Sequence, residues 1–298
     1  VVKHYLDTFH VVKMTKTKDD IEALVTKLGN SANLKFNSCI VSIADFVNSM
    51  SKDELKANLL ECGVLPECFN HDSTEEKLYA KYSDCLLAKV WSEIGIPCNV
   101  LQTRADSADV VGKTKNYSIV GDAKVFRLSR TAKNQKDFKV EALDKWRKEN
   151  DYACLVSPLY QYPNTNSQIY HQAISRNVTL LGYIHLYFFL ATPNIEKIDL
   201  SAIWDIGTTL KDSKSATYYW ASVEKIICKT VRRHAIELNE LKQCELKLLS
   251  DLGKREISHL ESIVGQYKKM TKDEAIKKLI SAEKIDSKVI QIKNMCRL

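Results

Sequence analysis

The sequence predicts an α/β (α+β) fold, with a mixed β-sheet core flanked by helices and largely helical N- and C-terminal regions. Helical periodicity and capping motifs dominate residues 17–93. Short apolar runs alternate with helical and polar segments over residues 99–182. Residues 221–298 contain helix-forming residues and almost no proline or glycine. Together these patterns favour a sheet-containing core between two helical regions.

The N-terminal helices are predicted from their start signals. Residues 17–28 place apolar side chains at helical spacing. Ser51-Lys52-Asp53-Glu54 is a capping box, in which the serine and glutamate side chains bond to backbone amides of the first turn. It predicts a helix that ends near Gly63. A long helix is expected at residues 74–93.

After the helix at 74–93, the central region predicts a hairpin followed by alternating helices and strands. The hairpin is formed by two strands joined by a short turn, and a further short strand precedes it. In chain order the expected elements are strands at 99–101, 109–111 and 117–126, a helix at 134–148, a strand at 152–159, a helix through 170–174 and a strand at 178–182.

The chain contains neither internal repeats nor a low-complexity linker, so we expect one domain over residues 1–298. Residues 1–72 would form its helical N-terminal region, residues 73–195 its catalytic core and residues 196–298 its mainly helical C-terminal region.

Composition predicts a cytoplasmic protein. Nine cysteines, an odd number scattered through apolar surroundings, are typical of free thiols in a reducing compartment. The longest apolar stretch, residues 180–191, is too short to cross a bilayer. The net charge of +7, from 44 basic and 37 acidic residues, is too modest to indicate a nucleic-acid partner by itself.

The tripeptide Asp122-Ala123-Lys124 is the candidate catalytic site. It follows the apolar run Tyr117-Ser118-Ile119-Val120, and Asp109 precedes it in the chain. If the chain turns at residues 112–116, a hairpin brings both carboxylates together. Lys124, two positions beyond Asp122, would share its face of the strand.

These residue types suit phosphodiester hydrolysis, because attack on a phosphate anion builds negative charge that a cation must offset. Asp109, Asp122 and the backbone carbonyl of Ala123 offer the oxygen ligands that Mg²⁺ prefers. Lys124 would stabilise the developing charge. However, an acid two positions before a lysine recurs at several other places in this chain, so ordinary surface charge is the competing interpretation.

The basic segment after this site suits DNA. Arginine and lysine side chains match guanine or phosphate, and asparagine and glutamine match adenine. The alternative is an amphipathic helix with a solvated basic face. The candidate DNA-binding residues are Arg127, Ser129, Arg130, Lys133, Asn134, Gln135 and Lys136.

The stretch from Asp122 to Leu143 closely resembles the HindIII family of type II restriction endonucleases, within the PD-(D/E)xK nuclease superfamily. Weaker similarity extends over residues 50–190. The resemblance implies a restriction-endonuclease-like fold, a homodimer and Mg²⁺ as cofactor, for which Mn²⁺ can substitute. It also implies cleavage of double-stranded DNA at the palindrome AAGCTT after the first A, leaving 5′-phosphate ends with 5′ overhangs. A host of such an enzyme needs a cognate DNA methyltransferase.

Carried over to this chain, the family pattern assigns Asp109 as the first acid and Asp122 and Lys124 as the second acid and lysine. Ala108 stands where the superfamily name has proline. The segment between the acids is also two residues shorter than in the family pattern, which leaves Asp106 as a rival for the first acid. We favour Asp109 because two valines follow it and continue a strand.

A helix carboxylate often joins the metal site in this superfamily, and Glu76 and Asp84 are the candidates. Glu76 has a competing structural role, because Ser73-Thr74-Glu75-Glu76 is a capping box in which Glu76 would bond to the Ser73 amide. The sequence favours Glu76 over Asp84 as the possible additional metal ligand.

Two other functions fit the same residues. A structure-specific repair or recombination nuclease would use the same chemistry without a fixed sequence. A non-catalytic DNA-binding protein would need no metal, but it has no physical reason to keep buried like charges that only a metal makes tolerable.

Overall fold

The computed structural model describes residues 16–31, 34–100, 107–130, 135–283 and 285–296. The chain divides into two compact units, Val1–Leu252 and Gly253–Leu298. The first unit contains the sheet and the candidate site.

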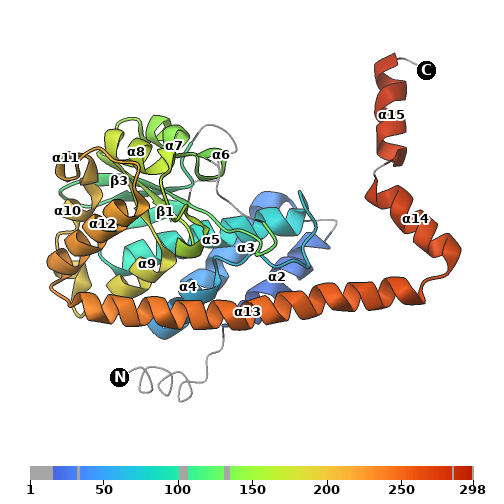
Figure 1. The fold of residues 1–298 in the computed structure, drawn as a ribbon, viewed down its shortest axis with the longest axis horizontal. Coiled ribbons are helices and arrows are strands. Elements are labelled where there is room, and N and C mark those ends of the chain that lie inside the picture. The colour runs from blue at the N-terminus through green and yellow to red at the C-terminus, as the bar shows by residue number, and fades with distance from the viewer. Residues whose placement is uncertain (1–15, 32–33, 101–106, 131–134, 284, 297–298) are drawn as a thin grey trace. The chain divides into compact units, whose positions relative to one another are not determined.

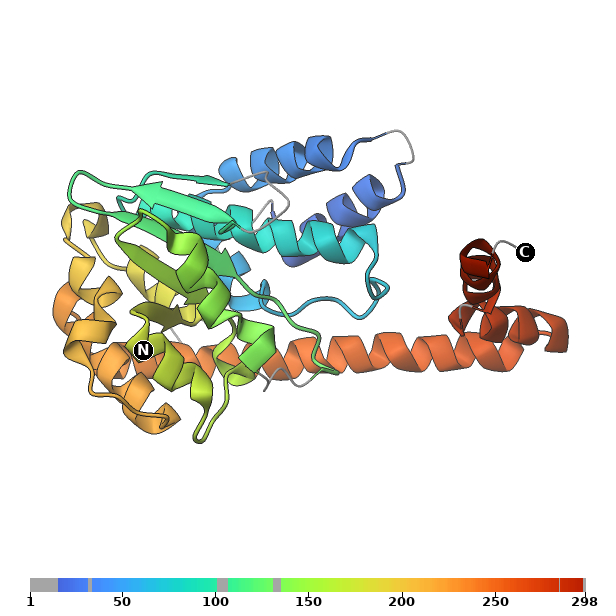
Figure 2. The same ribbon diagram turned by 90° about the horizontal axis from the view of Figure 1, so that it is seen from above.

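Five strands form one mixed sheet in the order β1-β2-β3-β4-β5 (Figure 1). Strands β1 to β3 pair antiparallel, whereas β3, β4 and β5 pair parallel. Helices flank this sheet, which confirms the predicted fold class (Figure 2). The strands are β1 (Cys98–Val100), β2 (Val110–Lys113), β3 (Ser118–Ala123), β4 (Tyr152–Val156) and β5 (Val178–Leu181).

The capping box predicted at Ser51 is present, and the helix predicted from periodicity at residues 17–28 begins at a second capping box. Thr17 and Ser51 each form a complete capping box at a helix start. The helix predicted at residues 74–93 has these bounds in the structure. The helices are α2 (Lys18–Gly29), α3 (Phe36–Asn48), α4 (Lys52–Glu61) and α5 (Thr74–Glu93).

Helix α5 is the main support of the antiparallel part of the sheet. It packs against β1, β2 and β3, and its Trp91 side chain is fully buried. A Cβ atom at Gly121 of β3 would lie 2.6 Å from the Trp91 ring. Glycine is therefore needed there for the helix and the strand to approach this closely.

The prediction of a single helix at 134–148 is wrong, because two helices occupy this region. They are separated at Lys139, whose φ of 49° is in the left-handed region. The buried Phe138 ends α6 (Gln135–Phe138) and the buried Val140 begins α7 (Val140–Arg147). Side chains two apart do not share a face of a continuous helix, so the left-handed residue between them allows both to enter the core.

Two predicted strands are shorter than expected. Strand β4, expected to reach residue 159, ends at Val156. Pro158 then precedes a 3₁₀ turn, η1 (Leu159–Gln161). Strand β3 ends at Ala123, and Phe126 instead forms an isolated parallel bridge with Val64.

The apolar stretch at 180–191 comprises the end of β5 and a helix, α9, whose residues are all buried. Such a helix belongs in a protein core. In the described part of the chain, the structure has no helix that is long and apolar enough to cross a membrane. The remaining elements of this region are α8 (Gln168–Ser175), α9 (Tyr183–Leu190), η2 (Ile195–Lys197), α10 (Ser201–Trp204), α11 (Ile206–Thr209) and α12 (Ala216–Val231).

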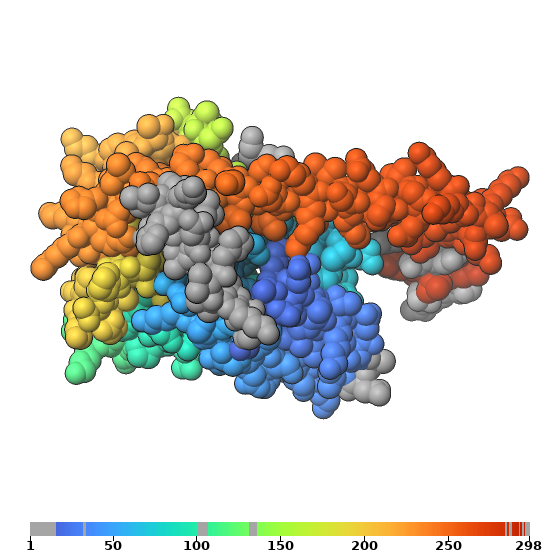
Figure 3. Space-filling model, turned by 90° about the horizontal axis from the view of Figure 1, so that it is seen from below, coloured from blue at the N-terminus to red at the C-terminus, as the bar shows by residue number. Residues whose placement is uncertain are grey.

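Helix α13 (Ala235–Lys269) begins in the first unit, where Leu238 and Leu241 join the core. This part of α13 lies across the face that carries α4 (Figure 3). Lys242 anchors it to α12, because its Nζ lies 2.8 Å from both carboxylate oxygens of Glu224. The second unit holds the rest of α13, followed by α14 (Lys272–Ala282) and α15 (Ile285–Cys296), which contact each other.

Candidate active site

The β2–β3 hairpin brings the two predicted acids together. Val110 pairs with Gly121, so Asp109 and Asp122 follow at the same end of the two strands. The hairpin closes where Thr114 N–H donates to the carbonyl of Tyr117 at 2.8 Å. The turn expected from the sequence is therefore present.

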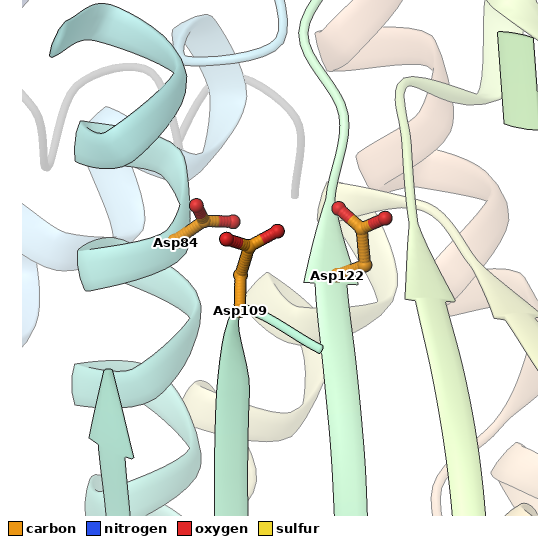
Figure 4. Close-up of side chains that lie close together, drawn as sticks. All are labelled: Asp84, Asp109 and Asp122. Carbon is orange, nitrogen blue, oxygen red and sulfur yellow. The ribbon is translucent and has the colours of Figure 1, made fainter. Parts of the chain in front are cut away.

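A third acid completes the cluster. Carboxylate oxygens of Asp84, Asp109 and Asp122 all lie within 4.8 Å of one another. The three side chains come from α5, from the residue before β2 and from β3, and they converge on one space (Figure 4). Asp84 and Asp122 are buried, whereas the side chain of Asp109 is 27% exposed.

Asp84 is the residue that sequence reasoning ranked too low. It stands in the apolar stretch Ser83-Asp84-Cys85-Leu86-Leu87 of α5, and all of these residues are buried. An acid surrounded by core residues is rare unless it is paired or binds a metal. That signal was present in the sequence.

Two lysines contact the acids. The Lys124 Nζ lies 2.6 Å from Oδ1 of Asp122. The Lys81 Nζ lies 3.2 Å from Oδ2 of Asp84 and also contacts Oδ1 of Asp109. Three carboxylates and two ammonium groups leave one net negative charge when all are ionised.

Burial decides the electrostatics of this cluster. It raises the pKa of Asp84, and the neighbouring Asp109 carboxylate raises it further. Burial also raises the pKa of Asp122, against the opposing effect of Lys124. Burial alone would lower the pKa of Lys124, but the attraction and hydrogen bond of Asp122, together with the charges of Asp84 and Asp109, outweigh it and the pKa is raised. Additional positive charge in the cluster is therefore favourable.

The cluster opens into a cleft of about 950 Å³. Lys77, Ser107, Lys139 and Trp146 are among its other lining residues. A second hollow of about 600 Å³ shares Lys139 and Trp146 with the first, so the two adjoin. Basic and aromatic side chains thus line the approach to the acids.

Glu76 lies outside the group of three acids. Its Oε2 accepts the Asp72 N–H at 2.7 Å and an Arg127 N–H at 3.2 Å. Ser73 caps the Glu76 amide at 3.1 Å, as expected. The prediction that the Glu76 carboxylate accepts the Ser73 N–H is wrong, because this carboxylate accepts hydrogen bonds from Asp72 and Arg127 instead.

The predicted DNA-binding residues differ in what they contact. Arg127 also donates to the carbonyl of Pro66 at 3.0 Å, and its side chain is only 14% exposed. Ser129 N–H donates to Glu67 at 3.1 Å. Arg130 pairs with Asp137 but remains 58% exposed.

Lys136 is exposed and lines the second hollow. Lys133 and Asn134 lie outside the described residues, as does Asp106, the rival first acid. Gln135 begins α6, but its side chain is not described.

The donor set fits a divalent cation. Three carboxylates gathered in a largely buried cluster supply hard oxygen ligands, which suit Mg²⁺, Mn²⁺ or Ca²⁺. A mixed sheet that carries acids and a lysine at the end of its central antiparallel pair defines the restriction-endonuclease-like class of nucleases.

Comparison with known proteins identifies the family. The family model "HindIII restriction endonuclease" matches residues 18–296. The type II restriction enzyme HindIII of Haemophilus influenzae is 32% identical over 283 residues, which cover 91% of this chain and 93% of that enzyme. The chain belongs to the HindIII restriction endonuclease family and, as a member, is a site-specific deoxyribonuclease.

Proposed function

We propose that the protein hydrolyses double-stranded DNA with Mg²⁺ at the palindrome AAGCTT, cutting after the first A and leaving 5′-phosphate ends with 5′ overhangs. The observation that carries this proposal is the group of Asp84, Asp109 and Asp122 beside Lys124, in a member of this family. The close resemblance of residues 122–143 to the family pattern supports the same target sequence.

Asp84, Asp109, Asp122 and the backbone carbonyl of Ala123 would hold the ion. Asp84 replaces Glu76 in this set, because Glu76 is engaged by Arg127. When bound, the ion neutralises charge on the phosphate and lowers the pKa of an attacking water.

Lys124 would hold the scissile phosphate. Its ammonium is fixed beside Asp122 and lines the cleft, so it can donate to a non-bridging oxygen without reorganising. Partial burial strengthens that interaction, because little water competes. Lys139 and Trp146 of the same cleft would exclude water from the DNA backbone.

The basic segment would contact the DNA beyond the scissile bond. We propose that Lys133, Asn134 and Gln135 supply base contacts and that Arg130 and Lys136 hold phosphates. Ser129 would also contact the DNA, whereas Arg127 orders the segment through Glu76 and Pro66.

A homodimer would place one site on each strand of the palindrome, because a two-fold axis presents the same half-site twice. A cognate methyltransferase would protect the host's own copies of the site. Sedimentation of the protein as a monomer even on DNA would contradict the dimer.

The decisive experiment incubates the protein with a sequenced plasmid, in Mg²⁺, in Mn²⁺ and in chelator, and sequences the ends. Cuts at AAGCTT that require the metal support the proposal. Ends without common sequence favour the structure-specific nuclease, and tight metal-independent binding without cleavage favours the non-catalytic protein.

A further inference from the structure

Lys81 bridges two of the three clustered acids. It lies on α5, three residues before Asp84, and its side chain is 19% exposed. Its ammonium contacts carboxylate oxygens of both Asp84 and Asp109. It therefore links the helix acid to the hairpin acid across the cleft.

Other lysines nearby do not share this position. Lys124 bonds to Asp122, the third acid. Lys77, one turn earlier on α5, lines the same cleft but is exposed. Lys89, two turns later, pairs with Glu93 at 2.7 Å and is 20% exposed, like Lys81, but it lies outside the cleft. Lys81 alone among these four bridges two of the clustered acids.

A divalent ion and the Lys81 ammonium would compete for the same oxygen atoms. Mg²⁺ and Mn²⁺ need carboxylate oxygens at about 2 Å. The Lys81 ammonium contacts one carboxylate oxygen of each of two acids, and its charge repels a second cation strongly at such distances. Binding is then an exchange in which the metal displaces the ammonium.

We infer that Lys81 is an internal counterion of the acid cluster, which a divalent ion must displace from Asp84 and Asp109. This inference rests on the metal site of the proposed function. It follows that Lys81 stabilises the protein without metal and weakens its affinity for metal. The residue thereby sets the metal concentration that the enzyme requires.

The test is a calorimetric titration of Mn²⁺ into the protein without DNA. Lys81→Met removes the charge and keeps most of the side-chain volume. We expect it to bind Mn²⁺ about tenfold more tightly than the unsubstituted protein, because the displacement cost disappears. Lys77→Met and Lys89→Met should leave the affinity within about twofold. Unchanged or weaker binding by Lys81→Met overturns the inference.

Thermal unfolding provides a second readout. In chelator, Lys81→Met should melt at a lower temperature than Lys89→Met, and saturating Mn²⁺ should raise its melting temperature by more. Lys81→Gln, which keeps a polar end, serves if the methionine variant does not fold. If Mn²⁺ raised the melting temperature of all variants equally, the proposed displacement of Lys81 by the metal would be contradicted.

Asp84→Asn separates this inference from the function on which it rests. If Asp84→Asn loses Mn²⁺ binding while Lys81→Met binds like the unsubstituted protein, the metal site stands and the counterion role fails. If Mn²⁺ binds to none of these proteins, or equally to all, both the metal assignment and the inference fail.

Discussion

The Asp84 carboxylate accepts the backbone N–H of Ala123 at 3.4 Å, and this contact joins α5 to the end of β3. Ala123 lies between Asp122 and Lys124, so the helix acid is held directly against the tripeptide Asp122-Ala123-Lys124. The spacing of the three acids therefore depends on how the helix docks, as well as on the hairpin.

Asp122→Asn and Lys124→Ala should each lower the cleavage rate by about a thousandfold or more, because each removes a charge that acts on the phosphate. Specific DNA binding should persist. Single-turnover cleavage and gel-shift titrations measure the two effects. Lys115→Ala, in the exposed hairpin turn, is the control, and normal cleavage by both site variants would refute the assignment.

Asp84→Asn should abolish metal-dependent cleavage, whereas Glu76→Gln should retain it. Only Asp84 belongs to the acid cluster, and Glu76 is bonded to Arg127 and Asp72. Cleavage rates measured across a range of Mg²⁺ concentrations distinguish the two carboxylates. If Glu76→Gln needed much more Mg²⁺ for cleavage while Asp84→Asn remained active, Glu76 and not Asp84 would be the metal ligand.

Arg127→Ala should lower the free energy of unfolding by about 2 kcal/mol, because the guanidinium bonds to Pro66 and Glu76 in a largely buried position. Lys136→Ala should leave stability unchanged and weaken binding to all DNA sequences alike. It should also reduce by about one the slope of log binding constant against log salt concentration. Urea unfolding and binding across salt concentrations test the pair. Equal stability of both variants would mean that Arg127 has no structural role.

Glu245→Gln should make the protein more stable at high pH. Burial of Glu245 raises the pKa of its carboxyl from 4.5 to about 7, against a smaller opposing effect of Lys242. Between these values the unfolded chain binds fewer protons than the folded protein, so stability falls as pH rises and levels off above pH 7. The shift corresponds to about 3 kcal/mol.

Urea unfolding from pH 4 to pH 8 tests this prediction. The stability difference between Glu245→Gln and the unsubstituted protein should grow with pH in favour of the variant. A difference that is constant over this range would show that Glu245 titrates normally in the folded protein.

Gly121→Ala should destabilise the protein by about 1 to 3 kcal/mol, because the added methyl would meet the Trp91 ring at 2.6 Å. Gly265→Ala is the matched control, since its new Cβ has no neighbour within 4 Å. That change in a helix should stabilise by up to about 1 kcal/mol. Equal melting temperatures of Gly121→Ala and the unsubstituted protein would show that α5 can shift without cost.

Local signals were sufficient for much of the fold. The capping box at Ser51, the periodicity of residues 17–28 and the bounds of α5 depend on local patterns that the sequence displays directly. The hairpin that joins Asp109 to Asp122 was predictable for a similar reason, because two short strands and one turn determine it.

Long-range contacts decided what the sequence did not show. The break at Lys139 arises because Phe138 stacks on Tyr162 while Val140 also enters the core. The partner of Arg127 is Glu76, 51 positions earlier, and no local pattern connects them.

The sequence by itself determined the fold class through periodicity and capping, and the resemblance of one contiguous stretch indicated the family and predicted the pair Asp122 and Lys124. Only the tertiary structure decided that Asp84, with Lys81 beside it, joins this pair and that Glu76 does not. Both carboxylates lie on α5, eight residues apart; the apolar neighbours of Asp84 indicate that it is buried, but they do not indicate which residues it meets. The docking of α5 on β3 through Gly121 and Trp91 brings Asp84 into the acid cluster.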